Sequence, residues 1–254
     1  MKPILEVSGL SKRFGGLVVA DAIDIKFNPG EVVGLIGPNG AGKTTLFNLL
    51  TGFIAPYAGE ITLGGQRIEL LPSYRRARLG IARTWQSPRL FPSLSILDNL
   101  LISDRNYPGE SLLDNIFRPG KVRAADRAAR ERAAGLLERI GLTRRANSLS
   151  TRLSYGQQKL VGLGRALMND GDCLLLDEPM AGVEGRVHDT MKSIIRQEAD
   201  AGKAVCIVEH NVGFIRDLCD RAAFMFNGRI VAIDTVDNLL ADKRLTELYF
   251  GAAS

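Results

Sequence analysis

The sequence predicts an α/β protein with a mostly parallel sheet, an antiparallel β subdomain and an inserted α-helical subdomain. Short strand-like runs fill the first third of the 254 residues, a helical stretch follows, and strand–helix–strand alternation then returns. Such alternation is typical of parallel sheets covered by helices. We therefore expect one domain with a core at 1–87 and 161–254 and a helical subdomain at about 88–160.

The predicted helices and strands follow from residue type and from the glycine and proline residues that mark turns. Strands are expected at Ile4–Val7, Val18–Phe27, Glu31–Ile36 and Glu60–Leu63, where β-branched residues lie between glycine and proline turns. A glycine-rich loop follows Ile36, and Lys43–Thr51 is predicted to be helical until Gly52 ends it. Further helices are expected at Ile96–Ile102, Arg123–Ile140 (with Gly141 as C-cap) and Val187–Ala199, and further strands at Cys173–Leu176 and Ala204–Val208.

Composition excludes several classes of protein. The chain is 45% hydrophobic and 24% charged with a net charge of +5, which is unlike disordered, collagenous or disulfide-scaffold proteins. No apolar run approaches the roughly 20 residues that span a bilayer, and Glu6 interrupts any signal-like start. The three cysteines, Cys173, Cys206 and Cys219, have no metal spacing. We expect a soluble protein with buried, reduced thiols, the last of them in a helix.

The positive charge is concentrated in one segment. Between Arg118 and Arg145 there are nine basic and three acidic residues, so this segment carries +6 and the rest of the chain −1. A solvated helix face explains such a pattern, and so does a surface for anionic lipid or nucleic acid. Charge alone does not choose among these.

A phosphate-binding loop is the strongest motif. Gly37-Pro38-Asn39-Gly40-Ala41-Gly42-Lys43-Thr44 matches G-x-x-x-x-G-K-[ST] between an apolar strand and a helix. Glycines let backbone N–H groups turn inward around phosphate, and the helix N-terminus adds its positive dipole end. Lys43 is expected to reach the β- and γ-phosphates, and the Thr44 hydroxyl to ligate Mg²⁺. The core is therefore that of a P-loop NTPase.

Carboxylates and a histidine follow two apolar strands. Asp177 and Glu178 end the run that starts at Cys173, and Glu209 and His210 follow Ala204–Val208. Ligands bind beyond the carboxyl ends of parallel strands, so Asp177 is placed to hold Mg²⁺ and Glu178 to act as general base on water. A lone histidine at the end of a strand is usually structural. Its similarity in position to Asp177 and Glu178, which also end a strand, raises the chance that His210 faces the same ligand. His188 is left unassigned.

Leu153-Ser154-Tyr155-Gly156-Gln157-Gln158 precedes a helix-like run, with Ser154 as its N-cap. Taken together with the motifs above, this segment resembles the signature of ATP-binding-cassette (ABC) transporter subunits, here with Tyr155 where glycine is commoner. Gln86 resembles the glutamine-loop residue of that family, His210 the switch histidine, and Phe14 the aromatic residue that stacks on adenine. The similarity covers nearly the whole chain, with the motifs in family order.

The resemblance implies an ATPase that uses ATP and Mg²⁺ and works as a nucleotide-sandwich dimer. Catalytic roles are implied for Lys43, Gln86, Glu178 and His210, and magnesium contacts for Thr44, Gln86 and Asp177. Nucleotide contacts are implied for Phe14, Gly37, Pro38, Asn39, Gly40, Ala41, Gly42, Lys43, Thr44, Thr45, Ser154, Gly156 and Gln157. Of these, Ser154 and Gly156 would reach the γ-phosphate held by the facing subunit. The implied partners are two polytopic permease subunits, a second ATP-binding subunit (a paralogue or another copy) and, indirectly, an external substrate-binding protein, with no nucleic acid.

Within the family, the chain resembles branched-chain amino-acid importer ATPases, and the longer of their two types. Gly34-Leu35-Ile36-Gly37-Pro38-Asn39-Gly40, Arg83-Thr84-Trp85-Gln86, the signature and the C-terminal Leu248-Tyr249-Phe250-Gly251 carry the similarity to these importers. The stretch from about Ser103 to Ala125 resembles the longer of the two types. It implies a peripheral protein on the cytoplasmic face of the inner or plasma membrane. Urea and amide importers share much of the pattern, and pI ≈ 9.2 leaves a soluble ABC-type ATPase acting on nucleic acid or ribosomes as a rival. A third alternative, a regulatory subunit that binds ATP without hydrolysis, conflicts with intact Glu178, Gln86 and His210.

Two positions depart from the family pattern. Glu184 stands where Asp or Asn is commoner, in the dimer-contacting loop after Glu178, and a longer side chain there would affect communication between ATP sites rather than chemistry. Phe14 is followed by Gly15-Gly16, which makes its stacking on adenine less firmly anchored.

Overall fold

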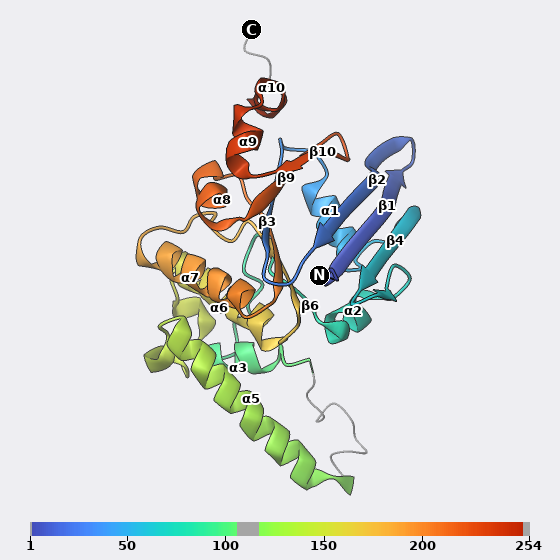
Figure 1. Cartoon of the computed structure of the whole chain (residues 1–254). Helices are drawn as coiled ribbons and strands as arrows, with labels where there is room; N and C mark the ends of the chain where they lie inside the picture. Colours follow the sequence, from blue (N-terminus) through green and yellow to red (C-terminus); the bar gives the residue numbers. More distant parts are fainter. Residues whose placement is uncertain (1, 106–116, 251–254) are drawn as a thin grey trace. The chain divides into compact units, whose positions relative to one another are not determined.

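The computed structural model describes residues 2–105 and 117–250, and the chain in it forms two compact units (Figure 1). The first unit comprises Met1–Arg83, Gly171–Met180 and Ile195–Ser254, and the second comprises Thr84–Asp170 and Ala181–Ile194. No helix of the described residues is both long enough and apolar enough to cross a membrane. The subdomain boundaries expected at about 88 and 160 stay a prediction.

A four-stranded antiparallel sheet in the first unit has the order β2-β1-β4-β5. Its strands are β1 (Leu5–Phe14), β2 (Leu17–Phe27), β4 (Ala58–Leu63) and β5 (Gln66–Arg67). Strand β1 runs well past the expected end at Val7, because a register shift between Val7 and Leu10 absorbs Gly9, whose φ is +59°. The Gly9 N–H donates to Asp24 Oδ1 at 2.8 Å, so the irregularity keeps a hydrogen bond.

The second sheet of this unit has six strands in the order β10-β9-β3-β8-β7-β6. Five strands are parallel to one another: β3 (Val32–Ile36), β6 (Ile81–Arg83), β7 (Cys173–Asp177), β8 (Ala204–Val208) and β9 (Arg221–Phe226). The edge strand β10 (Arg229–Asp234) is antiparallel to β9. Every residue of β3, β7 and β8 is buried, as expected for parallel strands covered on both faces.

The strand registers bring three chain segments to one edge of this sheet. Val208 is paired with Leu35 of β3 on one side and with Asp177 of β7 on the other. The loop after Ile36, the residues after Asp177 and the residues after Val208 therefore leave the sheet together. Ligands of open parallel sheets bind at this edge.

Helix α1 (Lys43–Leu50) of the first unit ends against a buried arginine. Arg76, on α2 (Ser73–Leu79), donates to the carbonyls of Leu49 and Leu50 at 2.6 and 3.0 Å and to that of Glu69 at 2.8 Å. These bonds satisfy carbonyls that the end of a helix leaves unpaired. Burial lowers the pKa of Arg76, and the charge of Glu69 opposes that shift. The remaining helices, α8 (Val212–Leu218), α9 (Val236–Ala241) and α10 (Lys243–Phe250), follow β8 and β10.

The second unit is helical. It contains α3 (Ile96–Leu101), α5 (Pro119–Arg139), α6 (Tyr155–Met168) and the short 3₁₀ turns Thr143–Arg145 and Ser150–Arg152. Helix α5 buries the alanine and leucine face formed by Ala129, Ala133, Leu136 and Leu137, and Gly141 (φ +68°) follows it as expected of a C-terminal glycine. Helix α7 (Arg186–Asp200) begins in this unit and continues into the first.

The three cysteines are free, as expected. Cys173 and Cys206 are fully buried in β7 and β8, whereas Cys219 is half-buried. The expectation that Cys219 lies in a helix is wrong, because α8 ends at Leu218 and Cys219 has an extended backbone with ψ of 138°. Burial raises the pKa of Cys173 and Cys219 to about 12 and that of Cys206 well above its ordinary value.

Candidate functional site

The loop between β3 and α1 requires glycine at specific positions. Gly37 has φ of +150°, and a β-carbon there would lie 2.1 Å from the Met225 carbonyl oxygen. Gly42 has φ of +104°, and a β-carbon there would lie 2.7 Å from the Val19 carbonyl oxygen. No side chain fits at either position. Glycine at both positions allows the backbone to make a tight turn at the N-terminus of α1.

Lys43, the first residue of α1, points back into this loop. Its Nζ donates to the carbonyls of Gly37 at 2.6 Å and Pro38 at 3.0 Å, and the residue is buried. Burial lowers the pKa of Lys43, while the charges of Glu178 and Asp177 act in the opposite direction. The ammonium group therefore lies at the centre of the loop with two carboxylates in electrostatic reach.

A hollow of about 210 Å³ joins this loop to two strand ends. Val19, Asn39, Gly40, Ala41, Gly42, Lys43, Thr44, Thr45, Glu178, Val208 and His210 line it. The structure thus brings together the phosphate loop, Glu178 and His210, which the sequence predicts from separate motifs. Sequence reasoning missed Val19 and Val208, because apolar strand residues carry no chemical signal. Phe14 is not among the lining residues; the residue is 51% exposed, and Lys12 Nζ lies 5.2 Å from the centre of its ring.

Glu178 is held in an unusual backbone conformation. Its φ is +45°, in the left-handed region that side chains disfavour, and its N–H donates to the Val208 carbonyl at 2.9 Å. Its Oε1 lies 3.2 Å from His210 Nε2. Backbone strain of this kind persists only where the surroundings fix it, and it clusters at functional sites. The Glu178 carboxylate and the His210 imidazole, which follow neighbouring strands, are therefore held together as a pair.

Asp177 is paired with an arginine that the sequence analysis did not single out. Arg83 Nη2 lies 2.8 Å from Asp177 Oδ2, and both side chains are almost completely buried. Arg83 also donates to Asn48 Oδ1 at 2.7 Å. The sequence carries no local signal for this pair, because β6 is only three residues long and its pairing with β7 is a long-range feature.

Glu209 ties the two strand ends together. Its Oε1 accepts a hydrogen bond from the Met180 N–H at 2.6 Å, and its Oε2 accepts one from the His210 N–H at 3.1 Å. The side chain is buried. Sequence reasoning noted Glu209 but gave it no role; its carboxylate fixes the chain on either side of the Glu178–His210 pair.

Of the predicted magnesium donors, Thr44 lines the hollow, whereas Asp177 is not among its lining residues and has Oδ2 paired with Arg83. The Thr44 hydroxyl and the Asp177 carboxylate are hard oxygen ligands, which Mg²⁺ prefers. Among the residues that the structure describes, no group of three or more His, Cys, Asp and Glu side chains could hold a metal on its own. Mg²⁺ typically takes one or two protein oxygens and completes its shell with water and substrate phosphate, so this donor set suits it.

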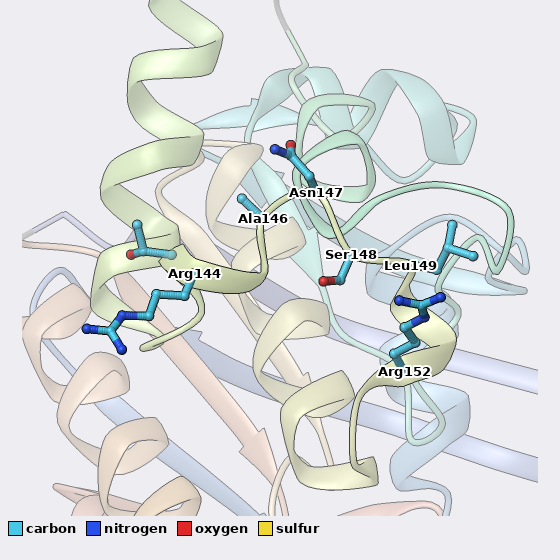
Figure 2. A pocket seen from close by; sticks show the side chains of 7 residues that line it. Arg144, Ala146, Asn147, Ser148, Leu149 and Arg152 are labelled. Atoms are coloured by element: carbon cyan, nitrogen blue, oxygen red, sulfur yellow. The ribbon is translucent and has the colours of Figure 1, made fainter.

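The remaining predicted residues lie in the second unit. Ser154 is the N-cap of α6: its hydroxyl accepts from the Gln157 N–H at 3.3 Å, and Gln157 Oε1 accepts from the Ser154 N–H at 3.2 Å. This capping box confirms the expected cap. Gln86 is exposed, and Gly156 lies in the first turn of α6. A separate hollow of this unit (Figure 2) is lined by Thr143, Arg144, Ala146, Asn147, Ser148, Leu149 and Arg152, just before the Ser154 cap, and by no predicted site residue.

Comparison with known proteins identifies the family. A model of the ABC transporter family matches residues 20–181, more than half of the chain. The chain belongs to this family. The ABC ATPase is 37% identical to the high-affinity branched-chain amino acid transport ATP-binding protein BraF of Pseudomonas aeruginosa and 35% identical to LivG of Escherichia coli K12, each over 99% of both chains.

Solved structures agree with this. A nucleotide-free ATP-binding cassette from an ABC transporter superposes with a TM-score of 0.85 at 32% identity, covering 98% of this chain and 100% of the other. The ADP conformation of another such cassette gives 0.84 at 31% identity, covering 99% and 100%. The predicted fold class and family are both confirmed. The chain is an ABC transporter subunit that binds adenine nucleotides and hydrolyses ATP for transport.

Proposed function

We propose that this ABC ATPase powers an importer for branched-chain or related amino acids, at the cytoplasmic face of the inner or plasma membrane. The observation that carries the proposal is the hollow where the phosphate loop meets the Glu178–His210 pair, in a chain similar to BraF and LivG from end to end. Both relatives are named for high-affinity branched-chain amino acid transport.

Glu178 is the general base of the hydrolysis. Its carboxylate takes a proton from a water molecule, and the water oxygen forms a bond to the γ-phosphorus of ATP. The bond between the γ-phosphorus and the oxygen that bridges to the β-phosphorus breaks, and ADP and inorganic phosphate leave. His210, 3.2 Å from Glu178 Oε1, orients the carboxylate and contacts the γ-phosphate.

The phosphates are held by the loop Gly37–Thr45 and by the N-terminus of α1. Lys43 exchanges its two carbonyl acceptors for β- and γ-phosphate oxygens. Thr44, Asp177 and Gln86 would hold Mg²⁺, which would neutralise charge on the β- and γ-phosphates. The half-exposed ring of Phe14 stacks on the adenine.

The working form is a dimer in which Ser154 and Gly156 of one subunit meet the γ-phosphate bound by the facing subunit. A single phosphate loop leaves the far side of that phosphate uncovered, and charge stabilisation needs donors there. The second subunit is a paralogue or another copy of this chain. The core at 1–87 and 161–254 binds nucleotide, and the helical subdomain at about 88–160 faces two polytopic permease subunits. An external binding protein delivers the cargo, and no nucleic acid takes part.

Co-purification of the full chain from native membranes tests this proposal. We expect two polytopic membrane proteins and a second small ATPase to accompany it, and a strain lacking the chain to lose leucine, isoleucine and valine uptake. Loss of urea or amide uptake instead would assign the importer to the alternative cargo. Recovery mainly in the soluble fraction with DNA or ribosomes would overturn the importer and leave the ATPase chemistry in place.

A further inference from the structure

Tyr155 lies against the loop that follows the Glu178 strand end. A β-carbon added to Gly182 would be 3.1 Å from Cε1 and 3.3 Å from Cδ1 of the Tyr155 ring, closer than ordinary van der Waals contact. Gly182 has φ of +71°, which also favours glycine. A side chain at Gly182 would therefore press on the Tyr155 ring, in the first turn of α6, and would have to adopt a left-handed backbone.

The same face of α6 holds the main chain at Gln86. Lys159 Nζ donates to the Gln86 carbonyl oxygen at 2.5 Å, and the Tyr155 hydroxyl donates to that oxygen at 3.5 Å. Tyr155 and Lys159 are one helical turn apart, and the ammonium lies 5.7 Å from the centre of the Tyr155 ring. Lys159 is 5% exposed, so its charge is desolvated and the bond to the carbonyl is correspondingly strong.

We propose that Tyr155 and Lys159 are positioning residues for ATP hydrolysis, which fix the Gln86 segment and the Gly182 loop to the start of the signature helix α6. The inference rests on the role proposed above for Gln86. Neither side chain touches nucleotide in this account. When the Ser154–Gln157 turn moves, the hydrogen bonds to the Gln86 carbonyl oxygen move the Gln86 main chain with it. The contact between the Tyr155 ring and Gly182 moves the Gly182 loop in the same way.

The family-typical glycine at position 155 would supply neither contact. It has no ring to lie on Gly182 and no hydroxyl for Gln86. The tyrosine thus adds a ring contact with Gly182 and a hydrogen bond to the Gln86 carbonyl oxygen, whereas a glycine would leave the Lys159 bond to that oxygen in place. Gln86, Tyr155, Lys159 and Gly182 all belong to the second unit, so the link is internal to one compact body.

The first test removes the lysine contact. Lys159→Met keeps the length of the side chain and loses the donor, and we expect kcat for ATP to fall roughly tenfold while KM for ATP changes less than about twofold. Lys159→Arg keeps a donor and recovers most of kcat. The matched control is Lys121→Met, the same change at an exposed lysine of α5, which leaves both constants unchanged.

Tryptophan fluorescence reports on the Gln86 segment independently of activity. The chain has one tryptophan, Trp85, which directly precedes Gln86. In Lys159→Met we expect acrylamide to quench Trp85 emission more strongly than in the wild type, and Lys159→Arg to restore the wild-type quenching. A general packing defect would not be reversed by the arginine, which differs from lysine in shape but retains the charge and the donors.

A double-mutant cycle tests the contact between Tyr155 and Gly182. Gly182→Ala adds a methyl group against the ring and strains φ, whereas in the Tyr155→Gly background only the strain remains. We expect Gly182→Ala to lower kcat about threefold more in the wild type than in Tyr155→Gly. Equal fold-changes in the two backgrounds would remove Tyr155 from this role.

The proposal is overturned if Lys159→Met retains wild-type kcat and quenching, or if Gln86→Ala retains wild-type kcat, because a residue without a role needs no positioning. Failure of the proposed hydrolysis is a distinct result: it is seen as unaltered turnover in Glu178→Gln, whatever the Lys159 variants do.

Discussion

His210 Nε2 lies 3.2 Å from Glu178 Oε1, although the two residues end different strands and are 32 positions apart in the chain (210 − 178). The pair depends on the parallel pairing of β7 with β8, and Glu209 holds the chain on both sides of it through the N–H groups of Met180 and His210. Backbone geometry thus brings the carboxylate and the imidazole together, with Glu178 in a left-handed conformation.

His210→Ala should lower kcat roughly 10- to 100-fold with little change in ATP affinity, because the imidazole orients the Glu178 carboxylate and the many donors of the loop Gly37–Thr45 still anchor the phosphates. Phosphate release and equilibrium nucleotide binding measure the two effects. The matched control is the other histidine: His188→Ala, on α7, should keep wild-type turnover. A loss of affinity equal to the loss of rate would contradict the orienting role.

Arg83→Met should cost about 3–5 kcal/mol of unfolding free energy, because it leaves the buried Asp177 carboxylate without its partner. Urea denaturation measures this. Arg130→Met breaks an exposed pair of similar length, 3.0 Å to Asp126, and should cost less than about 1 kcal/mol. Equal costs for the two variants would show that burial does not govern the Arg83 pair.

Gly37→Ala should abolish nucleotide binding, because the added β-carbon would lie 2.1 Å from the Met225 carbonyl oxygen and must displace backbone. Binding of a fluorescent ATP analogue and a thermal melt separate loop distortion from unfolding. Gly135→Ala, at an open position within α5, should bind like the wild type and be more stable by up to about 1 kcal/mol. Retained affinity in Gly37→Ala would refute the steric argument.

The cysteines predict a pH dependence of stability. Burial raises the pKa of Cys173 and Cys219 from 9.0 to about 12. Above pH 9 the unfolded chain releases thiol protons that the folded chain retains, so the stabilisation present below pH 9 is lost as the pH rises toward 12. Urea midpoints between pH 8 and 10.5 should fall, and a Cys173→Ser and Cys219→Ser double variant should show a shallower fall. At pH 8, thiol labelling should require unfolding; fast labelling of the folded chain would contradict this account.

Much of the fold could be predicted, because its signals are local. The strands Cys173–Leu176 and Ala204–Val208 were expected within one residue of β7 and β8, since fully buried parallel strands form continuous apolar runs. The cap at Ser154 was likewise expected. Strand β6 and helix α2 were missed, because three residues carry no periodicity and α2 begins after Pro72 without a side-chain cap.

The motif residues of the site could be predicted from the sequence, whereas the residues that hold them in place could not. The phosphate loop, Glu178 and His210 come together in one hollow, whereas Arg83 and Glu209 became visible only through strand order. Arg83 reaches Asp177 because β6 pairs with β7, a long-range fact that spacing does not contain. The roles assigned to Gln86, Ser154, Gly156, Gln157 and Phe14 stay predictions.

Phosphate release from ATP by Glu178→Gln, measured beside nucleotide binding, tests the central claim most directly. A general base contributes roughly 10²–10⁴-fold, so turnover should fall by at least about 100-fold while ATP affinity stays within about twofold of the wild type. Glu138→Gln, the same change at an exposed carboxylate of α5, should keep full activity. Unaltered turnover in Glu178→Gln would contradict the role of this residue as the base.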